Sequence, residues 1–321
     1  MNHAQALADA TDPGTAGLYA IGIDVGGTKI AGAVVNLARG TVALRHQIPT
    51  DCQRGGEPVL ADVEQLARLL LQESARLGVT PTAIGVGVAE LVDPGGQVFS
   101  DYLIKWKGID VQTRLAPILP TTVESDVRAA ALAEARFGAG LPYRDFLYLS
   151  LGTGVSGVLV QNGVPYAGSR GAALVIASGT SHHHCPQCGH VDSTTLEQIA
   201  SGPGLAEALG PWETGQSVLA AAHAGDPRAI HVVDHAAAEL AGTVALLANS
   251  LDPAAIIFGG GLGSAPGRYF DSLKAAILAG LWEGDHHPLP ILQAAFGADA
   301  GIVGAALYTT LHQEPANRPS R

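Results

Sequence analysis

The amino-acid sequence predicts an α/β protein built from two lobes of similar design. Its 321 residues are enough for one large domain or for two lobes with their own cores. A strand, a glycine-containing turn and a second strand open the pattern at Tyr19–Val35, and the same order recurs at Phe146–Gln161. Segments with helical spacing of apolar residues follow each of these hairpins. The recurrence suggests that each lobe begins with a hairpin turn of a size that suits a phosphate group.

The first lobe, placed at residues 18–126, is expected to contain a three-strand meander, a long helix and two further strands. These segments are Tyr19–Val25, Lys29–Val35, Thr41–Ile48, Val59–Leu77, Ala83–Val88 and Thr121–Glu124. Gly78 follows the helical spacing and has the place of a C-terminal cap. We expect a final helix at 301–312 to pack back on this lobe and complete it.

The second lobe, placed at residues 127–300, is expected to be the larger one. Its predicted helices are Val127–Phe137, Thr195–Leu209 and Ala236–Leu251. Its predicted strands are Phe146–Leu151, Val155–Gln161 and Ala255–Phe258.

Charge and composition exclude several classes of partner. The formal net charge of −11 repels phosphate backbones, so we expect no nucleic acid. We find no apolar run that predicts a membrane span, and the first residues lack the basic start and apolar core of a signal peptide. Three cysteines, Cys52, Cys185 and Cys188, do not make a disulfide framework. We therefore expect a cytoplasmic protein without a membrane partner.

The first glycine-rich turn is Asp24-Val25-Gly26-Gly27-Thr28-Lys29. Two glycines at a turn between strands leave backbone N–H groups exposed, and such groups can hold phosphate oxygens. Asp24 has the place of a carboxylate that holds Mg²⁺ through water, and Lys29 adds positive charge. An ordinary hairpin turn is the alternative interpretation.

Two later turns repeat this chemistry. Gly152-Thr153-Gly154 has the same design in the second lobe, and Gly259-Gly260-Gly261 follows a buried strand. Glycines at the third turn, chiefly Gly260 and Gly261, would let an adenine and its ribose lie against the backbone. Each turn alone is also typical of an ordinary connection, so their order along the chain is more informative than any one of them.

In this order the motifs resemble those of the ROK family (repressor, open reading frame, kinase), which includes glucokinases and N-acyl-hexosamine kinases. The resemblance runs from about residue 18 to residue 312. The segments that carry it are Ile21–Lys29, Leu149–Gly157, Arg170–Ala173 and Leu196-Glu197 through Ala200-Ser201-Gly202.

The resemblance implies an actin-like ATPase fold of the ribonuclease H-like kind, with two lobes around a nucleotide cleft that holds ATP, Mg²⁺ and an acceptor hydroxyl. It also implies that Asp126 is the catalytic base, because the family places an Asn-Asp pair after the strand that ends here at Glu124. A carboxylate within reach can take the acceptor proton during phosphoryl transfer. Capping of the helix that starts at Val127 is an alternative role, and the two roles are compatible.

The sequence departs from the family where the sugar should bind. Ser125 replaces the Asn of the Asn-Asp pair, so an amide that holds a sugar hydroxyl is lost. Val175 replaces a sugar-binding carboxylate, and Ser178 replaces a histidine that touches both sugar and zinc. Each lost hydrogen bond removes roughly 1 kcal/mol of net binding. An Asn of the family falls near Tyr102, whereas Glu197 keeps the last sugar-binding carboxylate.

Two interpretations of these changes remain open. The first is a kinase for another small-molecule alcohol, such as an aminosugar or a C7-cyclitol, with Glu90 and Asp101 as candidates to hold an amine. Solvated carboxylates are the alternative for these two residues. The second is a protein that keeps the fold but has lost sugar phosphorylation and serves in binding or regulation. Retention of both phosphate turns and of Asp126 favours the first.

A cluster of cysteines and histidines predicts a structural zinc ion. Cys185 and Cys188 have knuckle spacing, which puts two thiolates on one ion. The proposed ligands are Cys185, Cys188, His190 and one of His182, His183 or His184, with His184 preferred. The family holds zinc here with one His and three Cys, but those positions fall at Ser178 and near Thr195 in this chain. A surface loop with free thiols is the alternative.

Other members of the family suggest further expectations. Its repressors carry an added N-terminal DNA-binding domain, whereas fewer than twenty residues precede the first predicted strand here, so we do not expect a regulator. By analogy with the family we expect a homodimer. ATP is the expected phosphoryl donor, with polyphosphate, which some relatives use, as the alternative.

Overall fold

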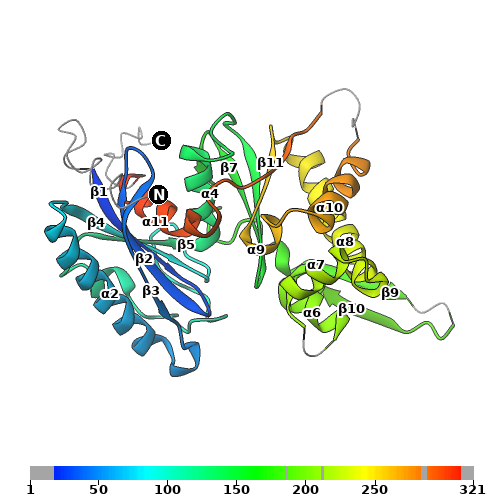
Figure 1. Cartoon of the computed structure of the whole chain (residues 1–321), viewed down its shortest axis with the longest axis horizontal. Helices are drawn as coiled ribbons and strands as arrows, with labels where there is room; N and C mark the ends of the chain where they lie inside the picture. The colour runs from blue at the N-terminus through cyan, green and yellow to red at the C-terminus, as the bar shows by residue number, and fades with distance from the viewer. Residues whose placement is uncertain (1–17, 185–186, 211–212, 283–287, 312–321) are drawn as a thin grey trace. The chain divides into compact units, whose positions relative to one another are not determined.

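The computed structural model describes residues 18–184, 187–210, 213–282 and 288–311 of the chain (Figure 1). Within these ranges the chain forms two compact units: unit 1 comprises residues 18–137, 165–173 and 299–311, and unit 2 comprises residues 138–164 and 174–298. Helix α4 (Asp126–Phe137) belongs to unit 1, although the sequence analysis starts the second lobe at residue 127. The reason is that α4 packs against α11 (Ala300–Leu311), which lies on the sheet of unit 1.

Unit 1 is built on a five-stranded sheet in the order β3-β2-β1-β4-β5. The strands are β1 (Tyr19–Val25), β2 (Lys29–Asn36), β3 (Thr41–Pro49), β4 (Pro81–Val88) and β5 (Thr121–Ser125). The first three form an antiparallel meander, and β4 and β5 continue the sheet parallel to β1. The predicted meander and the two later strands are thus confirmed.

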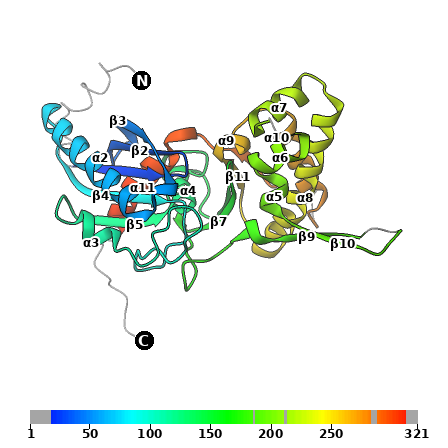
Figure 2. The same cartoon turned by 90° about the horizontal axis from the view of Figure 1, so that it is seen from below.

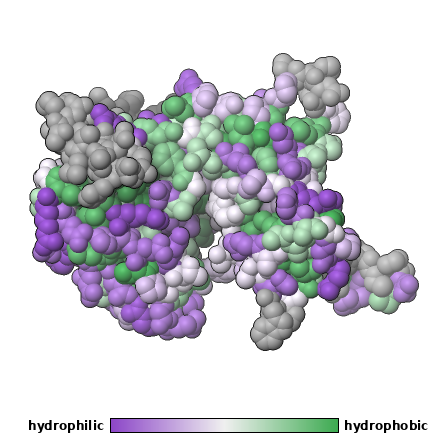
Figure 3. Space-filling model, in the orientation of Figure 1, coloured by the Kyte–Doolittle hydropathy of each residue, from purple (hydrophilic) through white to green (hydrophobic). Residues whose placement is uncertain are grey.

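Helices cover both faces of this sheet (Figure 1). Helix α2 (Gly56–Arg76) buries an apolar stripe against one face, and α4 and α11 lie on the other. The short elements are η1 (Cys52–Arg54), α3 (Val111–Leu115) and η3 (Gly297–Asp299). Figure 3 shows mostly hydrophilic residues over the outer surface around α2 and β3, as expected for the water-facing side of an amphipathic helix.

Three glycines allow the backbone of α11 to contact the backbones of β1, β4 and α4 directly. A Cβ atom at Gly22 of β1 would overlap the carbonyl oxygen of Ile302, and one at Gly85 of β4 would overlap that of Ala305. A Cβ at Gly304 of α11 would overlap the carbonyl oxygen of Ala129 in α4. The expected C-terminal helix therefore does pack on the first unit, and its N-terminus reaches the end of β1.

Unit 2 repeats the design with a sheet in the order β12-β11-β6-β7-β8. The strands are β6 (Phe146–Leu151), β7 (Val155–Gln161), β8 (Val164–Pro165), β11 (Ile256–Gly259) and β12 (Ile291–Gln293). Strands β6 and β7 form the predicted antiparallel hairpin, and β11 runs parallel to β6, as β4 does to β1 in unit 1.

The helices of unit 2 pack around one apolar core. They are α5 (Leu196–Ala200), α6 (Gly202–Leu209), α7 (Gly215–His223), α8 (Pro227–Leu251), α9 (Gly260–Gly263) and α10 (Arg268–Ala279). The prediction of a single helix at Thr195–Leu209 is wrong, because α5 ends before Ser201 and α6 begins after it. The hydroxyl of Ser201 accepts the N–H of Gly204, and Pro203 cannot continue the preceding helix, so a second helix starts there.

Helix α8 is long and apolar enough to pass a compositional test for a membrane span. Its buried residues line the core of unit 2 and include Val233, Leu240 and Val244. Burial in this core explains the apolar composition of the helix.

A two-stranded hairpin projects from the helices of unit 2 (Figure 2). It consists of β9 (Thr180–His184) and β10 (Val191–Thr195), and it follows a short turn of 3₁₀ helix, η2 (Ile176–Ser178). The sequence analysis did not predict this hairpin.

Candidate functional site

The first glycine turn joins β1 to β2 at the edge of unit 1 where β1 ends. The N–H of Gly26 donates to the carbonyl of Lys29 at 3.0 Å, which closes the turn. A Cβ at Gly27 would lie 2.8 Å from the side chain of Leu103, so the loop that carries Leu103 covers one side of the turn. The thiol of Cys52 donates to the carbonyl of Gly27 at 3.3 Å on the same turn.

Asp24, at the end of β1, faces the start of helix α11. A Cβ added to Gly301 would lie 2.6 Å from Oδ2 of Asp24, so the carboxyl packs directly against the first turn of the helix. Burial raises the pKa of Asp24 to about 6, although the positive charge of Lys29 opposes the shift.

Asp126 is the first residue of α4, and its side chain lies in the same unit as Asp24. Its Oδ1 accepts the N–H of Val127 at 2.7 Å. Burial raises the pKa of Asp126 to about 7, and the negative charge of Asp24 contributes to the rise. The N–H of Val127 and the charge of Arg128 act in the opposite direction without cancelling it.

Asp24 and Asp126 are neighbouring carboxyls whose pKa values stay raised although the charges of Lys29 and Arg128 act on them. A divalent cation would relieve the repulsion between Asp24 and Asp126, and carboxylate oxygens are the ligands that Mg²⁺ prefers. Magnesium usually takes only one or two carboxylates, with water and phosphate oxygens completing its shell. The residues present therefore fit the magnesium site that the sequence analysis predicts at Asp24.

Ser125 precedes Asp126, and its side chain faces α4. Its hydroxyl accepts the N–H of Arg128 at 3.5 Å, which is the pattern of a helix N-cap. The residue is 5% exposed. The structure thus gives Ser125 a role in starting the helix that presents Asp126.

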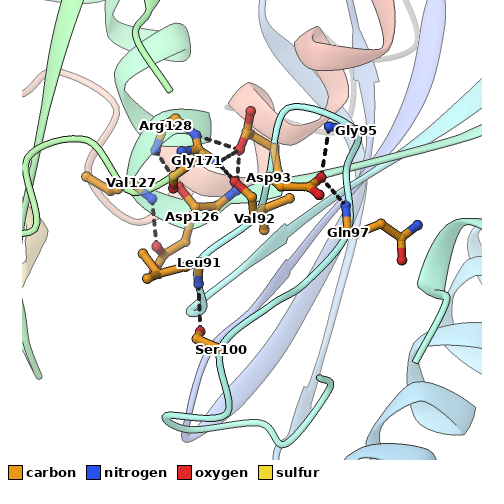
Figure 4. Close-up of polar contacts among 12 residues, drawn as sticks. Leu91, Val92, Asp93, Gly95, Gln97, Ser100, Asp126, Val127, Arg128 and Gly171 are labelled. Carbon is orange, nitrogen blue, oxygen red and sulfur yellow. Dashed lines mark hydrogen bonds and ion pairs between the residues drawn. The ribbon is translucent and has the colours of Figure 1, made fainter. Parts of the chain in front are cut away.

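Sequence analysis missed the buried ion pair beside these residues. Arg128 pairs with Glu124, four residues earlier, and Figure 4 shows its guanidinium in contact with the carbonyls of Val92 and Gly171. The spacing Glu-x-x-x-Arg was visible in the sequence, but such pairs usually lie on exposed helix faces.

Glu90, considered above as a candidate to bind an amine, forms hydrogen bonds with its own loop. Its Oε1 accepts the N–H groups of Leu103 and Ile104, and its Oε2 accepts the N–H of Tyr102 and the hydroxyl of Ser100. The side chain is 5% exposed. Both oxygens are therefore engaged in holding the loop that covers the first turn.

Asp101 lies on the outside of the same loop. It is exposed, and its Oδ1 accepts the N–H of Lys107 at 2.9 Å. Nothing in this arrangement prevents Asp101 from contacting a ligand.

The second glycine turn, between β6 and β7, is occupied on one side by Glu197. Oε2 of Glu197 accepts the N–H of Val155 at 3.0 Å, and a Cβ at Gly154 would lie 2.6 Å from the same oxygen. The predicted substrate carboxylate and the predicted phosphate turn are thus direct neighbours in unit 2.

The third turn lies beside the second. The N–H nitrogen of Gly261 would be 3.7 Å from a Cβ at Gly152, and Gly260 has φ +76° with its Cα against the carbonyl of Leu151. Two glycines that the sequence analysis did not select join them: Gly202 donates its N–H to Gly152 at 2.7 Å, and Gly215 touches Gly202. These backbones leave little room for side chains and meet at the N-termini of α6 and α7, where N–H groups favour anions.

Val175 and Ser178 lie together on the short turn η2. The hydroxyl of Ser178 donates to the carbonyl of Val175 at 3.1 Å, and both residues are exposed. Ile176 between them is buried in the core of unit 2 and anchors the turn.

The predicted zinc ligands lie where β9 turns into β10. His184 pairs with Val191 across this hairpin, so Cys188 and His190 belong to its connecting segment, and Cys188 is exposed. Cys185 lies outside the described residues, as does the side chain of His184. Among the residues that the structure describes, no group of three His, Cys, Asp or Glu side chains is close enough to hold a metal ion.

The fold and the turns found within each unit indicate the class of the protein. Each unit carries a strand–turn–strand hairpin suited to phosphate, and unit 1 adds a carboxyl whose pKa suits a general base. The chain is a phosphotransferase with the actin-like ATPase fold.

Comparison with known proteins agrees with this class. The chain is 30% identical over 315 residues to a glucokinase of Halalkalibacterium halodurans, covering 88% of this chain and 92% of that one. It is 28% identical to an N-acetylmannosamine kinase of Salmonella typhi, covering 89% and 97%. A Streptomyces griseus ROK family glucokinase, solved with glucose and AMPPNP, superposes with a TM-score of 0.74 at 28% identity, covering 90% and 98%. The ROK family model matches residues 20–311, so the chain belongs to the ROK family.

Proposed function

We propose that the protein is an ATP-dependent kinase that phosphorylates a hydroxyl group of a sugar or a sugar-like polyol. The names of its relatives, glucokinase and N-acetylmannosamine kinase, support this reaction. The observation that carries the proposal is the carboxyl of Asp126, which has a pKa of about 7 and lies near Asp24 of the first turn.

Asp126 has the properties of a general base at neutral pH. A carboxyl with a pKa near 7 is ionised in a large fraction of molecules, yet it is basic enough to accept a proton from an acceptor hydroxyl. Protonation of Asp126 also removes its repulsion with Asp24, which favours the proton transfer electrostatically.

The glycine turns would hold the phosphates of the donor. In unit 1 the N–H groups of Gly27 and Thr28 and the ammonium of Lys29 are proposed to do so, because the N–H of Gly26 already closes the turn on the carbonyl of Lys29. In unit 2 the N–H groups of Thr153 and Gly154 are proposed, because the N–H of Gly152 donates to the carbonyl of Gly154. Gly260 and Gly261 lie beside them and are proposed for the adenosine. Mg²⁺, when bound near Asp24, neutralises charge on the phosphate oxygens.

The acceptor is proposed to differ from glucose. Ser125 caps a helix and the side chain of Val175 offers no hydrogen bond, so these two positions offer fewer hydrogen bonds to a sugar than the family residues that they replace. Because both oxygens of Glu90 hold their own loop, Asp101 is the carboxylate proposed to hold an amine. Glu197 already accepts the N–H of Val155. An aminosugar or a C7-cyclitol therefore fits better than a hexose with only hydroxyl groups. The alternative is a protein that keeps the fold without sugar phosphorylation.

Further proposals concern a bound metal ion, the oligomeric state and the cellular location. We also propose a structural zinc ion bound by Cys185, Cys188, His190 and His184. The register of β9 and β10 pairs His184 with Val191, the residue that follows His190. We also retain a homodimer and a cytoplasmic location.

An ATP-turnover screen with hexoses, aminosugars, polyols and C7-cyclitols tests the function. Asp126→Asn should lower turnover by about 10²–10⁴, whereas the matched variant Asp226→Asn, at the N-cap of α8, should leave turnover unchanged. Unchanged turnover in Asp126→Asn would show that Asp126 only starts its helix. Absence of turnover across the panel, with either ATP or polyphosphate as donor, would favour the noncatalytic alternative.

A further inference from the structure

Arg128 occupies an electrostatically unfavourable position. It lies in the first turn of α4, where the positive end of the helix dipole disfavours a cation, and it is only 4% exposed. A buried guanidinium is stable only if nearby acceptors replace the water it has lost. Its hydrogen bonds therefore show what the residue does.

The guanidinium joins three separate segments of unit 1 (Figure 4). Nε donates to Glu124 at 2.6 Å, at the end of β5. Nη2 donates to the carbonyl of Val92 at 2.6 Å, and Nη1 donates to the carbonyl of Gly171 at 3.0 Å. The planar fork of arginine can serve these acceptors at once, which lysine cannot.

The two carbonyls belong to segments that have no regular strand pairing to hold them together. Val92 begins a small hairpin that closes at Val98, in which Oδ1 of Asp93 accepts the N–H groups of Gly95 and Gln97. Gly171 belongs to residues 165–173, which enter unit 1 between two parts of unit 2. Gly171 has φ +78°, and a Cβ there would overlap the carbonyl oxygen of Val92, so the two backbones are in contact.

A cavity of about 490 Å³ lies between these two segments. It is lined by Asp93, Pro94, Phe99, Ser169, Arg170 and Ala172. The lining offers a carboxylate, a hydroxyl, a guanidinium and an aromatic ring. This combination can accept and donate hydrogen bonds to a hydroxylated ligand while the ring contacts its apolar edge.

We propose that Arg128 is a positioning residue that holds the Val92–Val98 hairpin and residues 165–173 to the helix of Asp126, and that the cavity between them is a subsite for a hydroxyl-bearing part of the acceptor. The inference rests on the proposed kinase function. Residues 165–173 directly precede Val175 and Ser178 in the chain.

Steady-state kinetics test the inference, with acceptor and ATP varied separately. Arg128→Lys and Glu124→Gln should each raise the acceptor KM about tenfold or more and change the ATP KM by less than about twofold. In the cavity, Arg170→Ala should raise the acceptor KM with little effect on kcat. Arg136→Lys, at an exposed position on the same helix, is the matched control and should change neither constant.

Hydrogen exchange of the unliganded protein gives a readout that does not depend on activity. In Arg128→Lys the amides of residues 165–173 should exchange at least about tenfold faster, with those of β1 unchanged. An unchanged acceptor KM in the Arg128 and Arg170 variants, or an equal rise in both KM values, would overturn the inference. Absence of turnover in the unaltered protein would overturn the proposed function and the acceptor subsite, and the exchange rates would then decide the role of Arg128 alone.

Discussion

The two glycine turns share one design but differ in what surrounds them. The first turn, in unit 1, lies near Asp24 and Asp126, two carboxyls whose pKa values are raised by burial. The second, in unit 2, has Glu197 hydrogen-bonded to its backbone and is otherwise approached by glycine backbones, chiefly Gly202.

This difference suggests a division of labour. Burial raises the pKa of Asp24 and of Asp126 even though Asp126 accepts the N–H of Val127, and a carboxyl with a pKa near neutrality can exchange a proton. Glu197 instead holds the backbone of the second turn through the N–H of Val155. We therefore expect unit 1 to provide acid–base chemistry and unit 2 to provide backbone N–H groups for a phosphate-bearing ligand.

The largest effect on catalysis is expected from replacing Asp126 and Glu197, the carboxylates near the two turns, with amides. Asp126→Asn should lower kcat by about 10²–10⁴, the usual contribution of a general base. Glu197→Gln should mainly raise the acceptor KM, because Glu197 is expected to bind and not to transfer a proton. Equal losses of kcat in the two variants, measured by ATP turnover, would contradict the division of labour.

The ion pairs of the two units offer a second comparison. Arg128→Met should lower the free energy of unfolding by about 3–5 kcal/mol, because it removes the positive charge beside the carboxylate of Glu124, whose side chain is only 12% exposed. Asp234→Asn, which breaks the bond to Arg268 in unit 2, should have little effect since both partners are well exposed. Thermal unfolding checks both, and similar losses would show that burial does not set the strength of the Arg128 pair.

The raised pKa values of unit 1 predict a pH dependence of stability. Asp24 and Asp126 bind protons more tightly in the folded chain than in the unfolded chain, where their pKa is about 3.9. The free energy of unfolding should therefore fall as pH rises from about 4 to about 7, by at most about 1.4 kcal/mol per pH unit for each carboxyl.

Asp126→Asn should flatten this dependence, and Glu197→Gln should leave it in place. Denaturant unfolding at several pH values measures the effect. A slope that is the same in Asp126→Asn as in the unaltered chain would show that Asp126 has an ordinary pKa.

The smallest effect is expected from adding a methyl group to each turn. In Gly154→Ala the new Cβ would displace Oε2 of Glu197 and weaken its bond to Val155, at a cost of about 1–3 kcal/mol. In Gly27→Ala it meets only the end of the Leu103 side chain, which can rotate away. A greater fall in thermal midpoint for Gly27→Ala than for Gly154→Ala would contradict this ranking.

Local sequence patterns predicted much of the fold. The β1 hairpin and the β6 hairpin lie at the expected residues, because alternating apolar residues and glycine turns act over short distances. The break at Ser201 was missed, although Pro203 was a signal for it. The β9–β10 hairpin was also missed, since its histidines and threonines carry no apolar alternation.

What the sequence determined by itself is the order of its glycine turns, because such turns are local and need no contact to be recognised. Resemblance to the ROK family added the expectation that Asp126 is the base and that sugar ligands are replaced at Ser125, Val175 and Ser178. Only the tertiary structure shows that both carboxylate oxygens of Glu90 accept hydrogen bonds from residues 100–104 and that Arg128 donates to the carbonyl of Gly171. Both are long-range contacts between side chains and distant backbone groups, and only the folded chain brings those groups together. The pKa of Asp126 has the same origin, since burial and the proximity of Asp24 exist only after folding.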